Sequence, residues 1–190
     1  DFGHTGLPCS HPELLDYLAS ELMDSGWSLK HVHRLILTSA AYQQSSRNER
    51  PDAVAHDPGN TLLWRQNLRR LEGEAIRDAT LAVSGALNQE LYGRGIFPEL
   101  SAEVLSTQSR PGAGWDKSSK SQQHRRSVYI FVKRTLTIPM LDSFDAASPD
   151  TSQATRSTTT IAPQALILLN GAFSDEQSAA FIKAVKVPVH

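Results

Sequence analysis

The chain has 190 residues, enough for one hydrophobic core of ordinary size or for one core with an appended subdomain. Hydrophobic residues make up 39% of it and charged residues 21%, which is a soluble globular composition, and the formal net charge of −1 gives no basic field for nucleic acid or anionic lipid. The net charge therefore predicts no nucleic-acid partner. No apolar run approaches the roughly 20 residues that span a bilayer, so we expect no membrane span.

Two predicted helices follow each other closely near the start of the chain. Ser10 and Glu13 have the spacing of a capping box, and Gly26 marks the end of the first helix. Ser28 then caps a second helix that we expect to run to about Tyr42. Because the linker is very short, the two helices should pack as an antiparallel or steeply angled pair.

A third long helix is predicted from about Asn67 to Ser84. Its apolar face is centred between Leu71, Ala75 and Ala79. Gly85 and the polar residues that follow end the helical pattern, so we expect the helix to stop near this point.

The opposite side of this third helix carries a charged cluster. Its members are Arg70, Glu74, Arg77 and Asp78. A solvated face is the ordinary interpretation, but Leu81 lies among these charges, and both cations are arginines, whose planar group suits a desolvated pair. We therefore predict a central helix, covered on both sides, whose cluster is a buried ion-pair network with Asp145 among the candidate partners of Arg77.

The second half of the chain contains two long polar loops and a short apolar segment. The loops cover residues 101–126 and 146–156, and a stretch this long without secondary structure is usually functional or disordered. Residues 128–132 are β-branched and aromatic on both alternations, which predicts a strand buried on both faces. Residues 157–161 are the best candidate for its partner strand.

Two more helices close the chain. Pro163 opens one of them, and Asn170-Gly171 ends it. Residues 174–177 form a second capping-box pattern that starts the last helix. The expected fold is therefore mainly α, with orthogonal or antiparallel helix pairs, a small two- or three-stranded β element and long polar loops, and we treat residues 1–190 as a single domain.

Familiar catalytic motifs are missing from the sequence. It has no nucleophile elbow, P-loop or dinucleotide-binding motif. Asp1-Phe2-Gly3 is not the kinase motif, because His33-Arg34 comes after it instead of before it and is followed by Leu35 instead of an aspartate. Candidate catalytic residues are Asp1, His4 and His11, which a loop and a first helical turn could bring together, with Asp145 near the same cleft. Capping and loop-fixing roles are the alternative interpretation of these polar residues.

The histidines and the cysteine lack the spacing of metal ligands. His31 and His33 are two residues apart on a helix, so their side chains point in different directions. Cys9 is the single cysteine, and no Cys-x-x-Cys-His motif is present for a c-type haem. We expect no bound metal and no cofactor.

One aromatic residue and three arginines are candidate binding residues. Trp115 lies in a Gly- and Ser-rich loop and could stack on a sugar, or it could pack back onto the body of the protein as a loop anchor. Arg125, Arg126 and Arg156 complete the candidate set.

Motifs spread over nearly the whole chain occur in a characteristic order. They include Gly26-Trp27-Ser28-Leu29-Lys30, Arg70-Leu71-Glu72, Glu74-Ala75-Ile76-Arg77-Asp78, Arg125-Arg126-Ser127-Val128-Tyr129, Phe144-Asp145 and Pro163-Gln164-Ala165-Leu166. Together they resemble a large planctomycete family of unknown function, numbered fifteen fifty-three. The resemblance implies the C-terminal part of a long exported protein that follows a sister domain and often a cytochrome-c-like module, and it implies no catalytic residue.

Three hypotheses for the function follow. The leading one is a non-catalytic interaction or structural domain that packs against upstream domains of the same polypeptide. The alternatives are a glycan-acting enzyme or carbohydrate-binding module, and a docking scaffold for a cytochrome-c-like module, which rests on domain association alone. Because the chain opens without an initiator Met or a signal-peptide pattern, we expect a fragment with its targeting signal upstream and an apolar patch left uncovered. The expectation that the whole protein is exported rests on the family resemblance alone.

Overall fold

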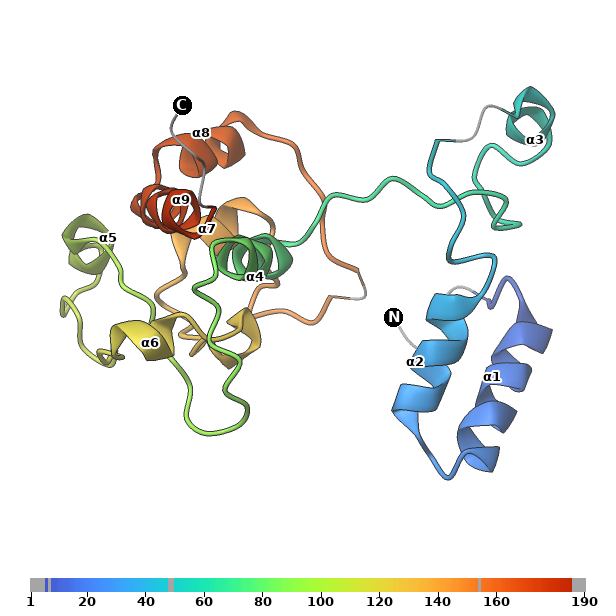
Figure 1. Ribbon diagram of the computed structural model, residues 1–190, viewed down its shortest axis with the longest axis horizontal. Helices are drawn as coiled ribbons and strands as arrows, with labels where there is room; N and C mark the ends of the chain where they lie inside the picture. Colours follow the sequence, from blue (N-terminus) through green and yellow to red (C-terminus); the bar gives the residue numbers. More distant parts are fainter. Residues whose placement is uncertain (1–5, 7, 48–49, 154, 186–190) are drawn as a thin grey trace. The chain divides into compact units, whose positions relative to one another are not determined.

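The computed structural model describes residues 6, 8–47, 50–153 and 155–185, and it is mainly helical, as the sequence predicts (Figure 1). The chain divides into two compact units, unit 1 from Asp1 to Arg69 and unit 2 from Arg70 to His190. Each unit is described by itself below. Within the described part of the chain, no helix is both long and apolar enough to cross a membrane.

Unit 1 is built on a helical hairpin. It contains α1 (Pro12–Asp24), α2 (Leu29–Thr38) and α3 (Pro51–His56). Helices α1 and α2 lie side by side and run in opposite directions, which confirms the antiparallel pair (Figure 1). Gly26 follows α1 with a φ of +68°, and the Ser28 hydroxyl accepts a hydrogen bond from the His31 amide at 3.3 Å, so both predicted end signals of the hairpin are confirmed.

The predicted start of α1 is wrong by one residue. His11 is the N-cap and makes no side-chain capping bond, while Pro12 occupies the first helical position that its fixed φ favours. The Ser10 hydroxyl lies 3.0 Å from the His11 Nδ1 atom instead of capping the helix. Helix α2 also ends earlier than expected, because Ser39 turns to an extended ψ of 146°.

A polar loop completes unit 1. The Asp57 carboxylate accepts hydrogen bonds from the Thr61 amide at 2.9 Å and the Leu62 amide at 2.7 Å, and these bonds lower the pKa of Asp57. The Asn60 amide group donates to the Arg65 carbonyl at 2.8 Å. Asp57 and Asn60 are the buried side chains of unit 1 among the residues described. Polar contacts therefore hold this loop.

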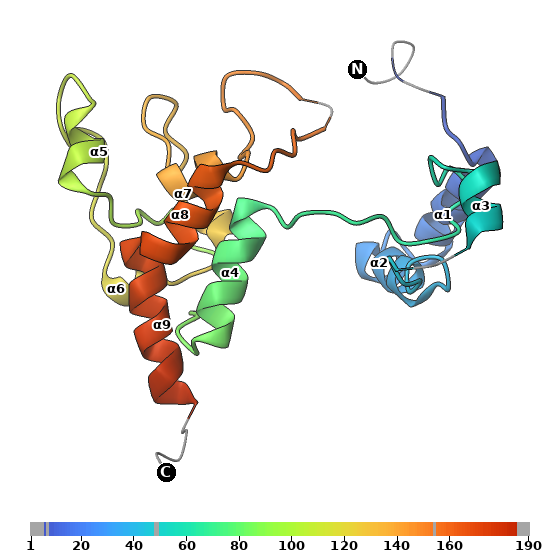
Figure 2. The same ribbon diagram turned by 90° about the horizontal axis from the view of Figure 1, so that it is seen from above.

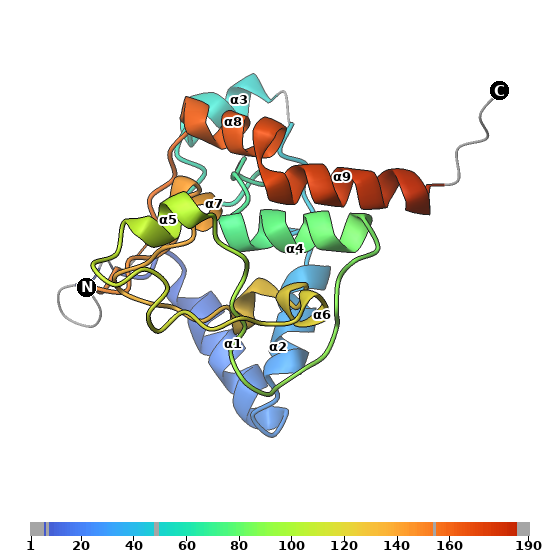
Figure 3. The same ribbon diagram turned by 90° about the vertical axis from the view of Figure 1, so that its left-hand side faces the viewer.

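Unit 2 contains the hydrophobic core. Its elements are α4 (Gly73–Val83), α5 (Ala102–Ser106), α6 (Lys120–Gln123), the 3-10 helix η2 (Ser127–Tyr129), α7 (Pro139–Ser143), α8 (Ala162–Asn170) and α9 (Ala172–Ala184). Helix α4 contacts η2, α7 and α9, and α9 runs alongside it (Figures 2 and 3). The buried apolar side chains are Leu81, Ile96, Leu136, Leu141 and Phe144.

Helix α4 differs from the predicted third helix in its start and in its buried face. It begins at Gly73 rather than Asn67, and its buried residues are Gly73, Arg77 and Leu81. These are spaced four apart and share one face. The face with Ala75 and Ala79, predicted to be buried, is exposed, because alanines offer little apolar area for packing. The helix is therefore not covered on both sides.

The predicted β element is not present among the described residues. Residues 128–132 begin inside η2, and Val128 and Val132 are 74% and 69% exposed, so this segment is not buried on both faces. Its pairing is a single parallel bridge between Ile96 and Ile130. The predicted partner, residues 157–161, forms no ladder in the described chain, because Thr159 hydrogen-bonds the Asp145 carboxylate instead.

The remaining helices agree with expectation in part. Residues 101–126 are not wholly irregular, since Ser101 caps α5 and Ser119 caps α6. Pro163 lies in the first turn of α8, as predicted, and Gly171 ends that helix. Helix α9 starts at Ala172, two residues before the predicted capping box, so the capping pattern lies inside the helix.

Candidate functional site

Arg77 lies at the centre of the polar interior of unit 2. Only 5% of its surface is exposed, and burial lowers the pKa of its guanidinium group. This group donates to the Arg125 carbonyl at 3.0 Å, to the Ser127 hydroxyl at 3.1 Å and to the Gln123 carbonyl. Asp78 accepts from the Ser127 amide at 2.7 Å. Arg77 and Asp78, which are neighbours on α4, thus both bind the backbone of residues 123–127.

The other charged residues around α4 pair with separate segments. Arg70 pairs with Asp145, whose carboxylate also accepts from the Thr159 amide at 2.8 Å. Glu74 forms a bidentate pair with Arg156 at 2.8 and 2.7 Å. Asp145 is one of the candidate partners of Arg77 in the sequence analysis, but it follows the end of α7 and pairs with Arg70 instead.

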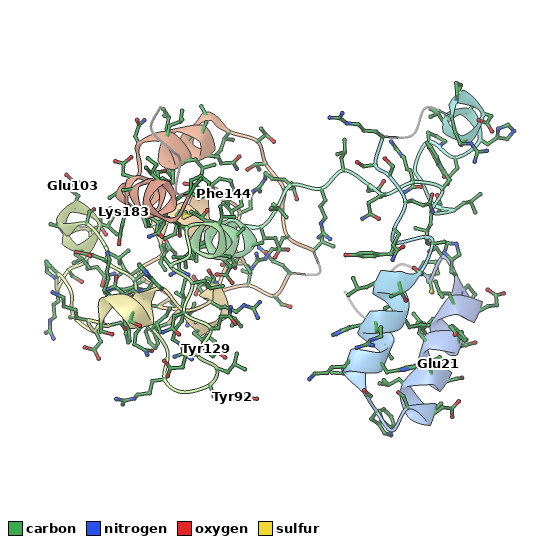
Figure 4. All side chains as sticks on the ribbon, viewed as in Figure 1. Glu21, Tyr92, Glu103, Tyr129, Phe144 and Lys183 are labelled. Carbon is green, nitrogen blue, oxygen red and sulfur yellow. The ribbon has the colours of Figure 1, made fainter. Side chains whose placement is uncertain are left out.

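Arg125 is buried and holds the backbone of a neighbouring loop. It is 1% exposed, and its guanidinium donates to the Glu90 carbonyl at 3.1 Å, to the Arg94 carbonyl at 3.3 Å and to the Tyr92 carbonyl. The same group lies 4.0 Å from the centre of the Tyr129 ring. Tyr92 and Tyr129 lie at one edge of unit 2 (Figure 4). Arg125 therefore fixes this loop and presents little surface to a ligand.

The other two candidate binding arginines are less buried. The Arg126 side chain is 58% exposed and lies 3.5 Å from Asp78. Arg156 pairs with Glu74 and with Glu72, the latter at 3.2 Å, and the hydrogen bonds that it donates to Glu74 are the largest cause of its raised pKa. Its charge is thus already matched by carboxylates.

Trp115 is packed as a loop anchor. Its indole N–H donates to the Pro98 carbonyl at 3.1 Å. Its ring meets Phe97 edge to face at a centroid distance of 5.4 Å, and Phe131 lies at 6.4 Å. The sequence left open whether Trp115 stacks on a sugar or packs onto the protein as a loop anchor, and these contacts are those of a loop anchor.

Of the four candidate catalytic residues, the described part of the chain includes His11 and Asp145. Asp1 and His4 lie outside the described part of the chain. His11 belongs to unit 1, and Asp145 belongs to unit 2. Within the described residues no group of three or more His, Cys, Asp or Glu side chains could hold a metal ion. The catalytic cluster stays a prediction.

Unit 2 has a groove of about 700 Å³ between α5, α6, α7 and the α8–α9 junction. Along one side, Lys120 and Glu176 pair at 2.7 Å, and His124 lies 3.7 Å from Glu176. Burial lowers the pKa of His124, although Glu176 opposes the shift. No motif in the sequence identifies His124, because the groove is assembled from distant segments. These charges are matched within the groove itself.

Unit 1 has a groove of about 840 Å³, which we call the hairpin groove. Six of its apolar and aromatic lining residues are Leu14, Tyr17, Leu35, Ile36, Tyr42 and Leu63. Leu14 and Tyr17 come from α1, Leu35 and Ile36 come from α2, and Tyr42 and Leu63 come from the chain that follows α2. Leu14 is 45% exposed and Ile36 is 38% exposed, so the apolar lining is open to solvent.

Residues 1–188 match PSD1, a protein family of unknown function (DUF1553). The chain belongs to the PSD1 family. This confirms the resemblance stated above on the basis of the ordered motifs. No curated protein and no solved structure matches the chain. The family match covers both units of the PSD1 chain, and the description of the family names no reaction or ligand.

Proposed function

We propose that this PSD1 chain is a non-catalytic interaction domain that docks through the hairpin groove onto another domain of a longer polypeptide. The family resemblance further suggests that this polypeptide is an exported multidomain protein from a planctomycete. The expectation of a sister domain upstream supplies a partner within the same polypeptide.

A single observation carries the proposal. Among the described residues of unit 1, no apolar side chain is buried. Helices α1, α2 and α3 contain no buried residue at all in the described chain. A helical hairpin is stabilised mainly by burying an apolar face, and this one leaves that face in water. Another surface that covers the groove would supply the missing burial.

Unit 2 provides the contrast within the same chain. Among its described residues, unit 2 has five buried apolar residues and several buried polar groups that hydrogen-bond one another. Arg77, Arg125 and Trp115 are engaged in contacts that hold unit 2 together. Nothing in these contacts favours the glycan or haem-module alternatives. Unit 2 therefore suits the role of a stable body that carries the docking surface.

Thiol labelling tests the proposal directly. Ile36→Cys, in a Cys9→Ser background, places a thiol in the hairpin groove. We expect rapid maleimide labelling of this thiol in the isolated chain and much slower labelling in the natural full-length polypeptide. The matched control is Leu91→Cys, which is 58% exposed and belongs to unit 2. Equal labelling rates at position 36 in the two proteins would refute docking.

A further inference from the structure

We infer that the hairpin groove binds an amphipathic helix that presents carboxylates to Arg65 and Arg69. The inference rests on the proposed function and adds the chemistry of the partner. The groove supplies two recognition features, which are its apolar lining and its two arginines, Arg65 and Arg69, which form no ion pair among the described residues. The first fixes the kind of secondary structure that fits, and the second fixes the sign of the partner's charge.

The charges of the groove are all of one sign. Arg65 and Arg69 line it, and no acidic residue does so in the described chain. Neither arginine forms an ion pair with any residue that the structure describes, and the buried Arg65 Nε atom has no hydrogen-bond partner there. The charge of Arg65 contributes to the lowered pKa of Asp57, but the Asp57 oxygens already accept hydrogen bonds from Thr61 and Leu62.

The shape of the groove favours a helix. Two antiparallel helices that lack a core are completed by a third helix packed into the groove between them. Such a helix would bury an apolar stripe at positions i, i+3, i+4 and i+7. A partner strand would need an exposed strand edge, and unit 1 offers none in the residues described. Carboxylates that flank the stripe would then meet the two arginines.

Two matched synthetic peptides test the inference by fluorescence anisotropy. Each has about 18 residues and the same leucine stripe, and they differ only in carrying glutamates or lysines beside it. We expect the isolated chain to bind the acidic peptide about tenfold more tightly than the basic one, with a preference that falls as salt is added. Leu35→Asp should abolish binding of both peptides, with circular dichroism checking that the variant stays helical.

Charge reversal locates the interaction. The double variant Arg65→Glu/Arg69→Glu should invert the preference toward the basic peptide. The control Lys30→Glu/Arg34→Glu, with the same change in net charge outside the groove lining, should keep the original preference. Retained preference in the first variant would overturn the inference.

Other outcomes separate this inference from the proposed function. Equal affinity for both peptides, lost in Leu35→Asp, would refute the charge requirement and leave docking intact. Binding of neither peptide would refute the helix, while the thiol labelling at position 36 would still decide docking. Concentration-dependent dimerisation, lost in Arg65→Glu/Arg69→Glu, would assign the groove to a second copy of the chain and overturn the inference.

Discussion

Buried arginines in unit 2 are bonded mainly to backbone carbonyl groups. Arg77 and Arg125 are 5% and 1% exposed, and each donates to carbonyl oxygens from several residues. The planar guanidinium group with five donors suits this role, because it can satisfy several fixed acceptors at once. A carbonyl that lost its donor inside unit 2 would stay unpaired, at a cost of about 1–3 kcal/mol.

Arg77→Ala should therefore lower the free energy of unfolding by about 3–5 kcal/mol. The variant removes the donor from two carbonyls and from the Ser127 hydroxyl in one step. Arg126→Ala is the control, because this exposed side chain has only a distant contact with Asp78 and should cost less than about 1 kcal/mol. Chemical denaturation measures both. Equal small losses would show that the Arg77 contacts contribute little.

Asp145 should make the stability of unit 2 depend on acidity. The Thr159 amide, followed by the Thr159 hydroxyl and Arg70, lowers the pKa of the Asp145 carboxyl in the folded state. Its contribution is present above its unfolded pKa of about 3.9 and is lost as the pH falls through the lower folded value. In denaturation at several pH values, Asp145→Asn should be less stable than the wild type at neutral pH, and the difference should shrink in acid. A constant difference would contradict this.

At the scale of elements, local signals located the helices better than they located the buried faces. Ser28, Gly26 and Pro163 act through their immediate neighbours, so their roles could be predicted from the sequence. The segment from 128 to 132 has β-type residues, but Ser127 is bonded to Asp78, 49 residues away in sequence, and the chain turns into η2 there. No local pattern carries that information.

The burial of Arg77 could be predicted from the sequence, but its carbonyl partners could not, for a similar reason. The central residue of the buried face of α4 is Arg77, and the carbonyls that accept its hydrogen bonds lie more than 40 residues away in the sequence. Hydrophobic periodicity alone counts arginine as polar and gives no sign of its burial. Arg77 could be singled out because Leu81 lies among charges, but its carbonyl partners could not. The candidate grooves, which are assembled from separate segments, were not predicted.

Gly73→Ala tests the close approach of α4 and α7. An added Cβ would lie 3.1 Å from the Phe144 Cβ atom and 3.3 Å from the Leu141 Cα atom, closer than ordinary contacts. We expect a loss of about 1–3 kcal/mol in chemical denaturation, although alanine is the better helix former. The control Ala75→Gly, at an exposed position of the same helix, should cost about 1 kcal/mol. A gain in stability for Gly73→Ala would show that no close packing exists there.

Ser28→Ala tests the cap of α2. Loss of the hydroxyl that accepts from the His31 amide should destabilise the helix by about 1 kcal/mol. Ser10→Ala is the matched control, because Ser10 makes no capping bond to α1, and it should change little. Amide exchange of α1 and α2 measures the two effects. A larger effect of Ser10→Ala would restore the capping box predicted from the sequence.

At the scale of the whole molecule, the two units of this PSD1 chain differ in how their apolar residues are used. Unit 2 buries them around α4, whereas unit 1 leaves them exposed around the hairpin groove. An uncovered apolar patch could be expected from the sequence. Its location could not, because α1 and α2 have ordinary helical stripes that appear suited to a local core. Only the tertiary arrangement shows that this core is missing.

Native-state hydrogen exchange of the isolated chain tests the central claim most directly. If the hairpin groove is an open docking surface, α1 and α2 open locally and their amides exchange much faster than those of α4 and α9, which exchange only through the larger unfolding of unit 2. Protection of the α1 and α2 amides equal to that of α4 would show that the hairpin is already stable by itself, and it would contradict the proposed docking function.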